Sequence, residues 1–74
     1  MEKKFTLGII GAGNMASAIL GGILRAGIVP ADKIALSDPD PEKRAVIAQN
    51  KVAVLDDNKT LAAQSEYLMF AVKP

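Results

Sequence analysis

Short apolar runs alternate along this chain with stretches whose apolar residues have helical spacing. The runs predict four strands, at 5–10, 33–37, 52–55 and 66–72. The stretches between them predict three helices, at 14–26, 41–49 and 59–64. Strands separated by crossover helices lie parallel, and right-handed crossovers give a doubly wound sheet. The pattern therefore predicts an α/β fold with the element order βαβαβαβ and the strand order 3-2-1-4.

Residues that begin and end helices support these boundaries. Gly27 follows the first helix in the position of a C′ glycine. Asp40 is the expected N-cap of the second helix, because Pro41 suits the first helical position. The third helix follows two aspartates and Asn58, and helix capping is the default interpretation of Asn58.

Two segments are more apolar than a small domain needs. The first helix has only three polar side chains, those of Asn14, Ser17 and Arg25, so we expect burial on more than one side. The run at 67–72 is continuously apolar, as in a strand of a parallel sheet that is covered on both faces. No helix follows it in these residues, so we expect an exposed apolar edge. We interpret the 74 residues as the N-terminal portion of a larger protein.

Composition narrows the classes of function. Half of the residues are hydrophobic and the net charge is +1, so nothing indicates binding to nucleic acid or to an anionic membrane. The chain has no Cys and no His, and we expect neither a metal site nor a catalytic residue within it.

No apolar segment reaches the roughly 20 residues that span a bilayer. Glycines interrupt the one stretch that imitates a signal peptide, so we expect a cytoplasmic protein.

The break between the first strand and the first helix carries the strongest chemical signal. Its sequence is Gly11-Ala12-Gly13-Asn14-Met15-Ala16, with an apolar strand directly before it and an apolar helix directly after it. In a Rossmann-type sheet the first glycine permits a tight turn, the second lets the backbone approach a pyrophosphate, and a small third residue lets the helix pack on the strand. The pyrophosphate then lies at the positive end of the helix. A tight turn without a ligand is the alternative, but the flanking elements favour a dinucleotide site.

Polar residues near the end of the second strand are candidates for the adenosine side. Asp38 lies 22 residues after Ala16, which is close to the spacing of an acid that accepts a hydrogen bond from a ribose 2′-hydroxyl and favours NADH. Ser37, Lys43 and Arg44 lie near it and could instead hold the 2′-phosphate of NADPH. A simple turn and a solvated helix face are the structural alternatives. The choice between NADH and NADPH stays open on this evidence.

The switch point of the predicted sheet falls between the first and fourth strands, where ligands bind outside the carboxyl ends of strands. Residues 11–15 reach this place from the first strand. From the fourth strand it is reached by Ala71, Val72, Lys73 and Pro74. Lys73 could tune the nicotinamide end of a cofactor, and an exposed lysine without a role is the alternative.

Four segments together resemble the pyrroline-5-carboxylate reductases, and the resemblance runs along all 74 positions. The glycine segment, with its continuation to Gly22, is shared with 3-hydroxyacid dehydrogenases and F420-dependent reductases. The terminal Ala71-Val72-Lys73-Pro74 after an apolar strand is more particular to the reductases, and its combination with the segments at 37–40 and 57–59 carries the resemblance.

The resemblance implies an enzyme that uses NADPH or NADH to reduce the C=N bond of a small molecule, 1-pyrroline-5-carboxylate, to L-proline in the last step of proline biosynthesis. It implies that residues 1–74 are the N-terminal part of an NAD(P)-binding domain. A C-terminal helical domain, absent here, would form a homo-oligomer and supply most of the substrate site. The implied cofactor-binding residues are Gly11, Ala12, Gly13, Asn14 and Met15 at the pyrophosphate, Ser37, Asp38 and Asn58 at the adenosine, and Ala71, Val72, Lys73 and Pro74 at the nicotinamide.

Two other functions share the opening glycine segment. One is another reductase or dehydrogenase, of the 3-hydroxyacid or F420-dependent kind. The other is a regulatory module that binds a dinucleotide without turnover. The segments at 37–40 and 71–74 argue against the other reductases and dehydrogenases. Nothing in these residues separates a regulatory module from an enzyme.

Overall fold

Four parallel strands form a single sheet in the computed structural model, which describes residues 3–11 and 13–71. The strands lie in the order β3-β2-β1-β4, as predicted, and β1 is therefore central. Leu7 of β1 aligns with Ile34 of β2 on one side and with Tyr67 of β4 on the other. The strand bounds are β1 Phe5–Ile10, β2 Ile34–Ser37, β3 Ala53–Leu55 and β4 Ser65–Phe70.

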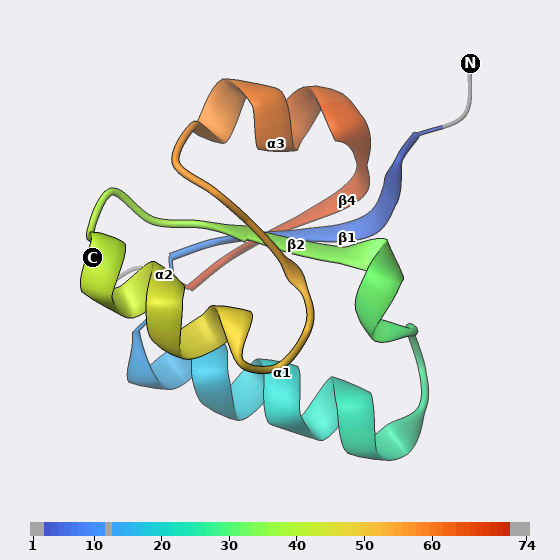
Figure 1. Cartoon of the computed structure of the whole chain (residues 1–74). Coiled ribbons are helices and arrows are strands. Elements are labelled where there is room, and N and C mark those ends of the chain that lie inside the picture. The colour runs from blue at the N-terminus through green and yellow to red at the C-terminus, as the bar shows by residue number, and fades with distance from the viewer. Residues whose placement is uncertain (1–2, 12, 72–74) are drawn as a thin grey trace.

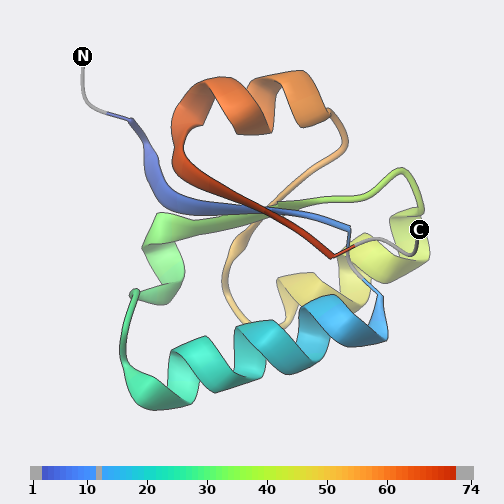
Figure 2. The same ribbon diagram turned by 180° about the vertical axis from the view of Figure 1, so that it is seen from behind.

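The helices cover both faces of this sheet. They are α1 Asn14–Ala26, α2 Pro41–Ala48 and α3 Asn58–Gln64. Figure 1 shows α1 and α2 on one face and α3 on the other, and Figure 2 shows the same three layers from behind. Helices on both faces of a parallel sheet are the Rossmann-type, doubly wound α/β arrangement that the sequence predicts.

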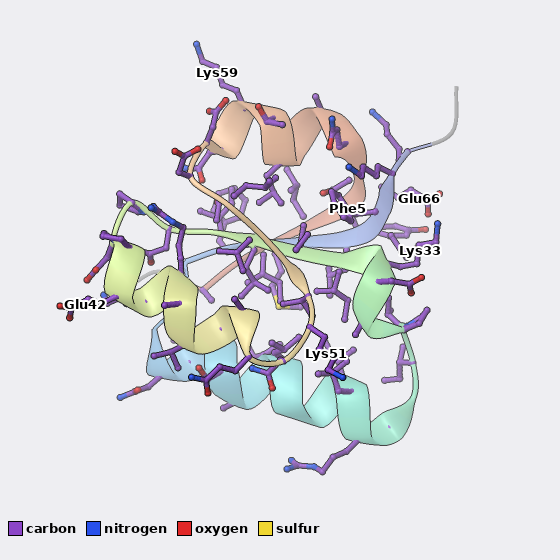
Figure 3. The ribbon with its side chains drawn as sticks, viewed as in Figure 1. Phe5, Lys33, Glu42, Lys51, Lys59 and Glu66 are labelled. Carbon is purple, nitrogen blue, oxygen red and sulfur yellow. The ribbon has the colours of Figure 1, made fainter. Side chains whose placement is uncertain are left out.

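Each face of the sheet has its own apolar core. On the side of α1 and α2, the core joins Ile9 and Leu36 of the sheet to Leu20 and Ile47 of the helices, all of them buried. On the side of α3, Phe5 and Ala35 pack with Leu61. Figure 3 shows Phe5 on that side of the sheet. Because the central strands are buried on both faces, their carboxyl ends are held firmly in place, and these ends position the site.

Several boundaries differ by one or two residues from the predicted ones. The fourth strand is Ser65–Phe70 rather than 66–72, the second helix ends at Ala48 rather than residue 49, and the third begins at Asn58 rather than residue 59. The second strand begins at Ile34 rather than residue 33, because Ala31–Lys33 form a 3₁₀ turn, η1, in which the Lys33 N–H donates to the Pro30 carbonyl at 2.9 Å. The third strand begins at Ala53, after a turn in which Lys51 has a φ of 64°.

The helix caps follow the predictions except at α3. Gly27 has a φ of 68° and ends α1, and the Asp40 side chain accepts from the Glu42 N–H at 2.9 Å at the start of α2. At α3 the capping residue is Asp57, so the default interpretation of Asn58 as the N-cap is wrong.

Apolar surface remains exposed on the outer strand and the first helix. In β4, Tyr67 is 68% exposed and Phe70 is 66% exposed, so the apolar edge expected from the sequence is exposed among the described residues. In α1 only Ala16 and Leu20 are buried, so these residues do not provide the burial on more than one side that we expected. No helix within the described ranges is long and apolar enough to cross a membrane.

Candidate dinucleotide site

The glycine turn after β1 is fixed to both neighbouring strands. Gly11 has a φ of 105°, a conformation that side chains strongly disfavour, so glycine is required for the chain to turn here. Its N–H donates to the Ser37 carbonyl of β2 at 2.8 Å. The Ala71 N–H, directly after β4, donates to the Ile10 carbonyl at 2.8 Å. The turn is therefore held at the carboxyl ends of β1, β2 and β4 together.

Gly13 is open on the side where a side chain would lie. Its φ of −83° and ψ of −162° suit any residue, and a Cβ built there would meet no atom of the described residues within 4 Å, its chain neighbours aside. The described part of the chain therefore gives no steric reason for glycine at this position. Open space in front of the backbone is what close approach of a phosphate requires.

The first turn of α1 offers donors to that space. Gly13 is the N-cap of α1 and supplies no side-chain cap, and no acidic residue lies in the first turn. The N–H groups at the start of a helix have no partner within the helix and carry partial positive charge. Asn14 and Met15 are both exposed there. The predicted pyrophosphate residues thus form an anion-compatible surface, as in other dinucleotide folds.

Ser37 and Asn58 lie 21 positions apart in sequence and meet at the end of β2. Ser37 is only 1% exposed, and its hydroxyl donates to Asn58 Oδ1. The sequence predicts both residues for the adenosine side but gives no sign that they pair. This hydrogen bond joins β2 to the first residue of α3.

Asp57 leaves Asn58 available for this pairing, because Asp57 takes over the capping role. Its Oδ1 accepts from the Lys59 N–H at 3.0 Å, and its Oδ2 accepts from Thr60 Oγ1 at 2.8 Å. The Thr60 hydrogen bond, followed by that from Lys59, lowers the pKa of the Asp57 carboxyl below its ordinary value. Figure 3 shows the Lys59 side chain directed away from the sheet.

Asp38 lies in a turn that hydrogen bonds to three other residues hold in place. Its Oδ1 accepts from the Asp40 N–H at 2.8 Å, its own N–H donates to the Leu55 carbonyl at 3.3 Å, and its carbonyl accepts from Arg44 Nη1 at 2.7 Å. Arg44 is half-buried, whereas Lys43 is exposed and has no polar partner among the described residues. Of the two cations considered for a 2′-phosphate, the structure brings Arg44 to the end of β2.

The nicotinamide side is described only as far as Ala71. Ala71 is 7% exposed and is fixed to β1 through its N–H, as described above. Val72, Lys73 and Pro74, and Ala12 in the glycine turn, lie outside the described residues. Within the described part of the chain, no group of three His, Cys, Asp or Glu could hold a metal ion.

Comparison with known proteins identifies the wider family. Residues 6–74 match the model of the family described as NADP oxidoreductase, coenzyme F420-dependent. The chain belongs to this family. Members of an NADP oxidoreductase family need a site for a nicotinamide dinucleotide, and the glycine turn at the carboxyl edge of the sheet has the geometry of one.

Individual relatives of this chain are named pyrroline-5-carboxylate reductases, which confirms the resemblance. One from Haemophilus influenzae is 44% identical over 74 residues, which are 100% of this chain and 27% of the relative. One from Pisum sativum is 35% identical over 74 residues, with the same coverage. One from Pseudomonas aeruginosa is 44% identical over 69 residues, 92% of this chain and 25% of the relative. The chain thus spans about a quarter of the length of these relatives.

Proposed function

We propose that this chain is the dinucleotide-binding part of a pyrroline-5-carboxylate reductase that uses NADPH or NADH. The observation that carries the proposal is Gly13, the N-cap of α1 at the carboxyl edge of the sheet, where an added Cβ would lie clear of the described residues apart from its chain neighbours. The names of the relatives support the substrate, 1-pyrroline-5-carboxylate, and the product, L-proline.

Each end of the cofactor has its own proposed residues. The backbone from Gly11 to Met15 binds the pyrophosphate, with Ala12 inside that turn. Ser37, Asp38 and Asn58 form the adenosine side. Residues 71–74 line the nicotinamide, with Val72, Lys73 and Pro74 following Ala71.

In the proposed hydride transfer, these residues need only hold the cofactor in position. The nicotinamide supplies a hydride, and a protonated C=N bond accepts it at carbon, so no protein nucleophile is needed. That suits a segment without Cys or His. What these residues contribute is a rigid edge of the sheet that holds the cofactor in one orientation. A C-terminal helical domain that makes a homo-oligomer and completes the substrate site is part of the proposal, as is a cytoplasmic location.

The test is a proline-forming assay of the full-length protein with each cofactor. We expect oxidation of NADPH or NADH that depends on 1-pyrroline-5-carboxylate and yields proline in equal amount. Turnover of a reduced deazaflavin or of a 3-hydroxyacid in its place would assign the chain to another enzyme of the wider group. Tight cofactor binding with no turnover of any of these substrates would indicate a regulatory module.

A further inference from the structure

The hydroxyl of Ser37 lies inside the protein, although the resemblance places this residue beside the cofactor. Ser37 is 1% exposed, and its one proton is donated to Asn58 Oδ1. The backbone carbonyl of Ser37 also accepts a hydrogen bond, from the Gly11 N–H. Ser37 is therefore poorly placed to contact a ligand directly, and it acts on the site through the group that it binds.

That group is the carboxamide of Asn58, which is exposed. A carboxamide has an acceptor end, the oxygen, and a donor end, the NH₂ group. Because Oδ1 is directed to Ser37, the NH₂ end is turned away from the buried hydroxyl, and Nδ2 has no partner among the described residues. Asn58 thus presents two N–H donors on the exposed side of the β2 end.

The neighbouring groups are also suited to a ligand that accepts hydrogen bonds. Arg44 uses one of the five N–H donors of its guanidinium on the Asp38 carbonyl. The Asp38 carboxylate, which could accept from a ribose hydroxyl, has one oxygen engaged by the Asp40 N–H. A 2′-phosphate accepts hydrogen bonds and carries negative charge, whereas a 2′-hydroxyl can also donate to a carboxylate.

We propose that Ser37 is a positioning residue, whose buried hydroxyl holds the Asn58 carboxamide with its N–H donors toward the 2′-phosphate and so favours NADPH over NADH. This inference rests on the proposed function, since it concerns the adenosine end of the same cofactor site. Asn58 contacts the phosphate, and Ser37 acts only through Asn58.

The experiment measures the dissociation constants of the full-length protein for 2′,5′-ADP and 5′-AMP, two probes that differ only in the 2′-phosphate. Ser37→Ala frees the carboxamide to rotate, and we expect it to weaken 2′,5′-ADP about threefold to tenfold, the scale of one hydrogen bond. The dissociation constant for 5′-AMP should stay within about twofold, because this probe lacks the 2′-phosphate that Asn58 contacts. Ser37→Thr keeps the hydroxyl and should restore the affinity for 2′,5′-ADP.

A double-mutant cycle separates positioning from a structural effect. Asn58→Ala alone should weaken 2′,5′-ADP, and adding Ser37→Ala should weaken it no further, because the group on which Ser37 acts is gone. A further loss in the double variant, or an equal loss of both probes in Ser37→Ala, overturns the proposal.

The two proposals fail in different ways. Wild-type protein that binds NADPH and NADH equally, and 2′,5′-ADP no better than 5′-AMP, overturns the role of Ser37 and leaves the reductase assignment intact. Wild-type protein that binds neither dinucleotide and neither probe overturns both.

Discussion

The hydroxyl of Ser65, at the start of β4, occupies the space into which a Cβ on Gly8 of β1 would project. A Cβ at Gly8 would also come within 3.0 Å of Leu61 Cγ in α3. Ser65 is 5% exposed, and its hydroxyl has no hydrogen-bond partner among the described residues. Gly8 is thus the residue that allows the chain to pass closely from α3 into β4 beside the central strand.

Gly8→Ala should therefore destabilise the fold. The Ser65 hydroxyl can rotate, but Ser65 Cβ and Leu61 Cγ, each 3.0 Å from the added Cβ, belong to buried side chains, and overpacking of this kind costs about 1–3 kcal/mol. The free energy of unfolding from urea titration of the full-length protein measures it. Ser65→Ala is the matched variant, since it removes a buried hydroxyl without a partner and should leave stability unchanged or raise it by about 1 kcal/mol. Equal destabilisation by both changes would contradict this account of the contact.

Gly13→Val should abolish dinucleotide binding while leaving the fold intact. A Cβ at this position meets no atom of the described residues within 4 Å, its chain neighbours aside, so the new side chain should fill the space that the proposed pyrophosphate needs. Fluorescence titration with NADPH, alongside circular dichroism, measures the two effects. Gly21→Ala is the control, because Gly21 lies within α1 and its added Cβ would also meet no side chain of the described residues within 4 Å, its chain neighbours aside. It should keep binding and stabilise the helix by about 0.5–1 kcal/mol. Unchanged affinity in Gly13→Val would place the pyrophosphate elsewhere.

Arg44→Gln should weaken NADPH about tenfold more than it weakens NADH, because a charge-assisted contact to a 2′-phosphate is lost. Lys43→Gln removes the same charge from the adjacent, exposed position and should change the ratio of kcat/KM values for the two cofactors less than twofold, as expected of a surface charge. Steady-state kinetics with both cofactors decide between the residues. Equal effects of the two variants would show that only the overall charge of α2 matters.

Lowering the pH should destabilise α3, because its N-cap Asp57 becomes protonated. The pKa of this carboxyl is lowered in the folded chain, so the ionised form stabilises the native state. That contribution is fully present above the unfolded pKa of about 4 and is lost as the pH falls through the lower, folded value. Amide hydrogen exchange in α3 between pH 5 and pH 2.5, corrected for the intrinsic pH dependence of exchange, measures the loss of protection. In Asp57→Asn this acid-dependent loss should shrink, and an unchanged profile would show that Asp57 does not control it.

Local sequence signals predicted the order of elements, the sheet topology and the position of the glycine turn, because each depends on residues close together in the chain. Gly27, Asp40 and the apolar runs are examples. Contacts between distant residues gave no such signal. Asn58 follows two aspartates that could equally cap the helix, and only the packing of α3 over β2 shows that Asp57 caps it while Asn58 meets Ser37. The contact between Gly8 and Ser65 was missed for the same reason.

The central place of β1 has a consequence for the order of folding. Its pairing with β4 joins Phe5 to Ser65 across 60 positions, the longest loop that these strands close. Loop closure of that length is slow compared with the formation of a helix or of a short crossover. One side of the glycine turn is anchored early by β2, whereas the other is anchored only when Ala71 reaches Ile10. The candidate dinucleotide site is therefore completed only when β4 joins the sheet, although the glycine turn itself forms between neighbouring elements.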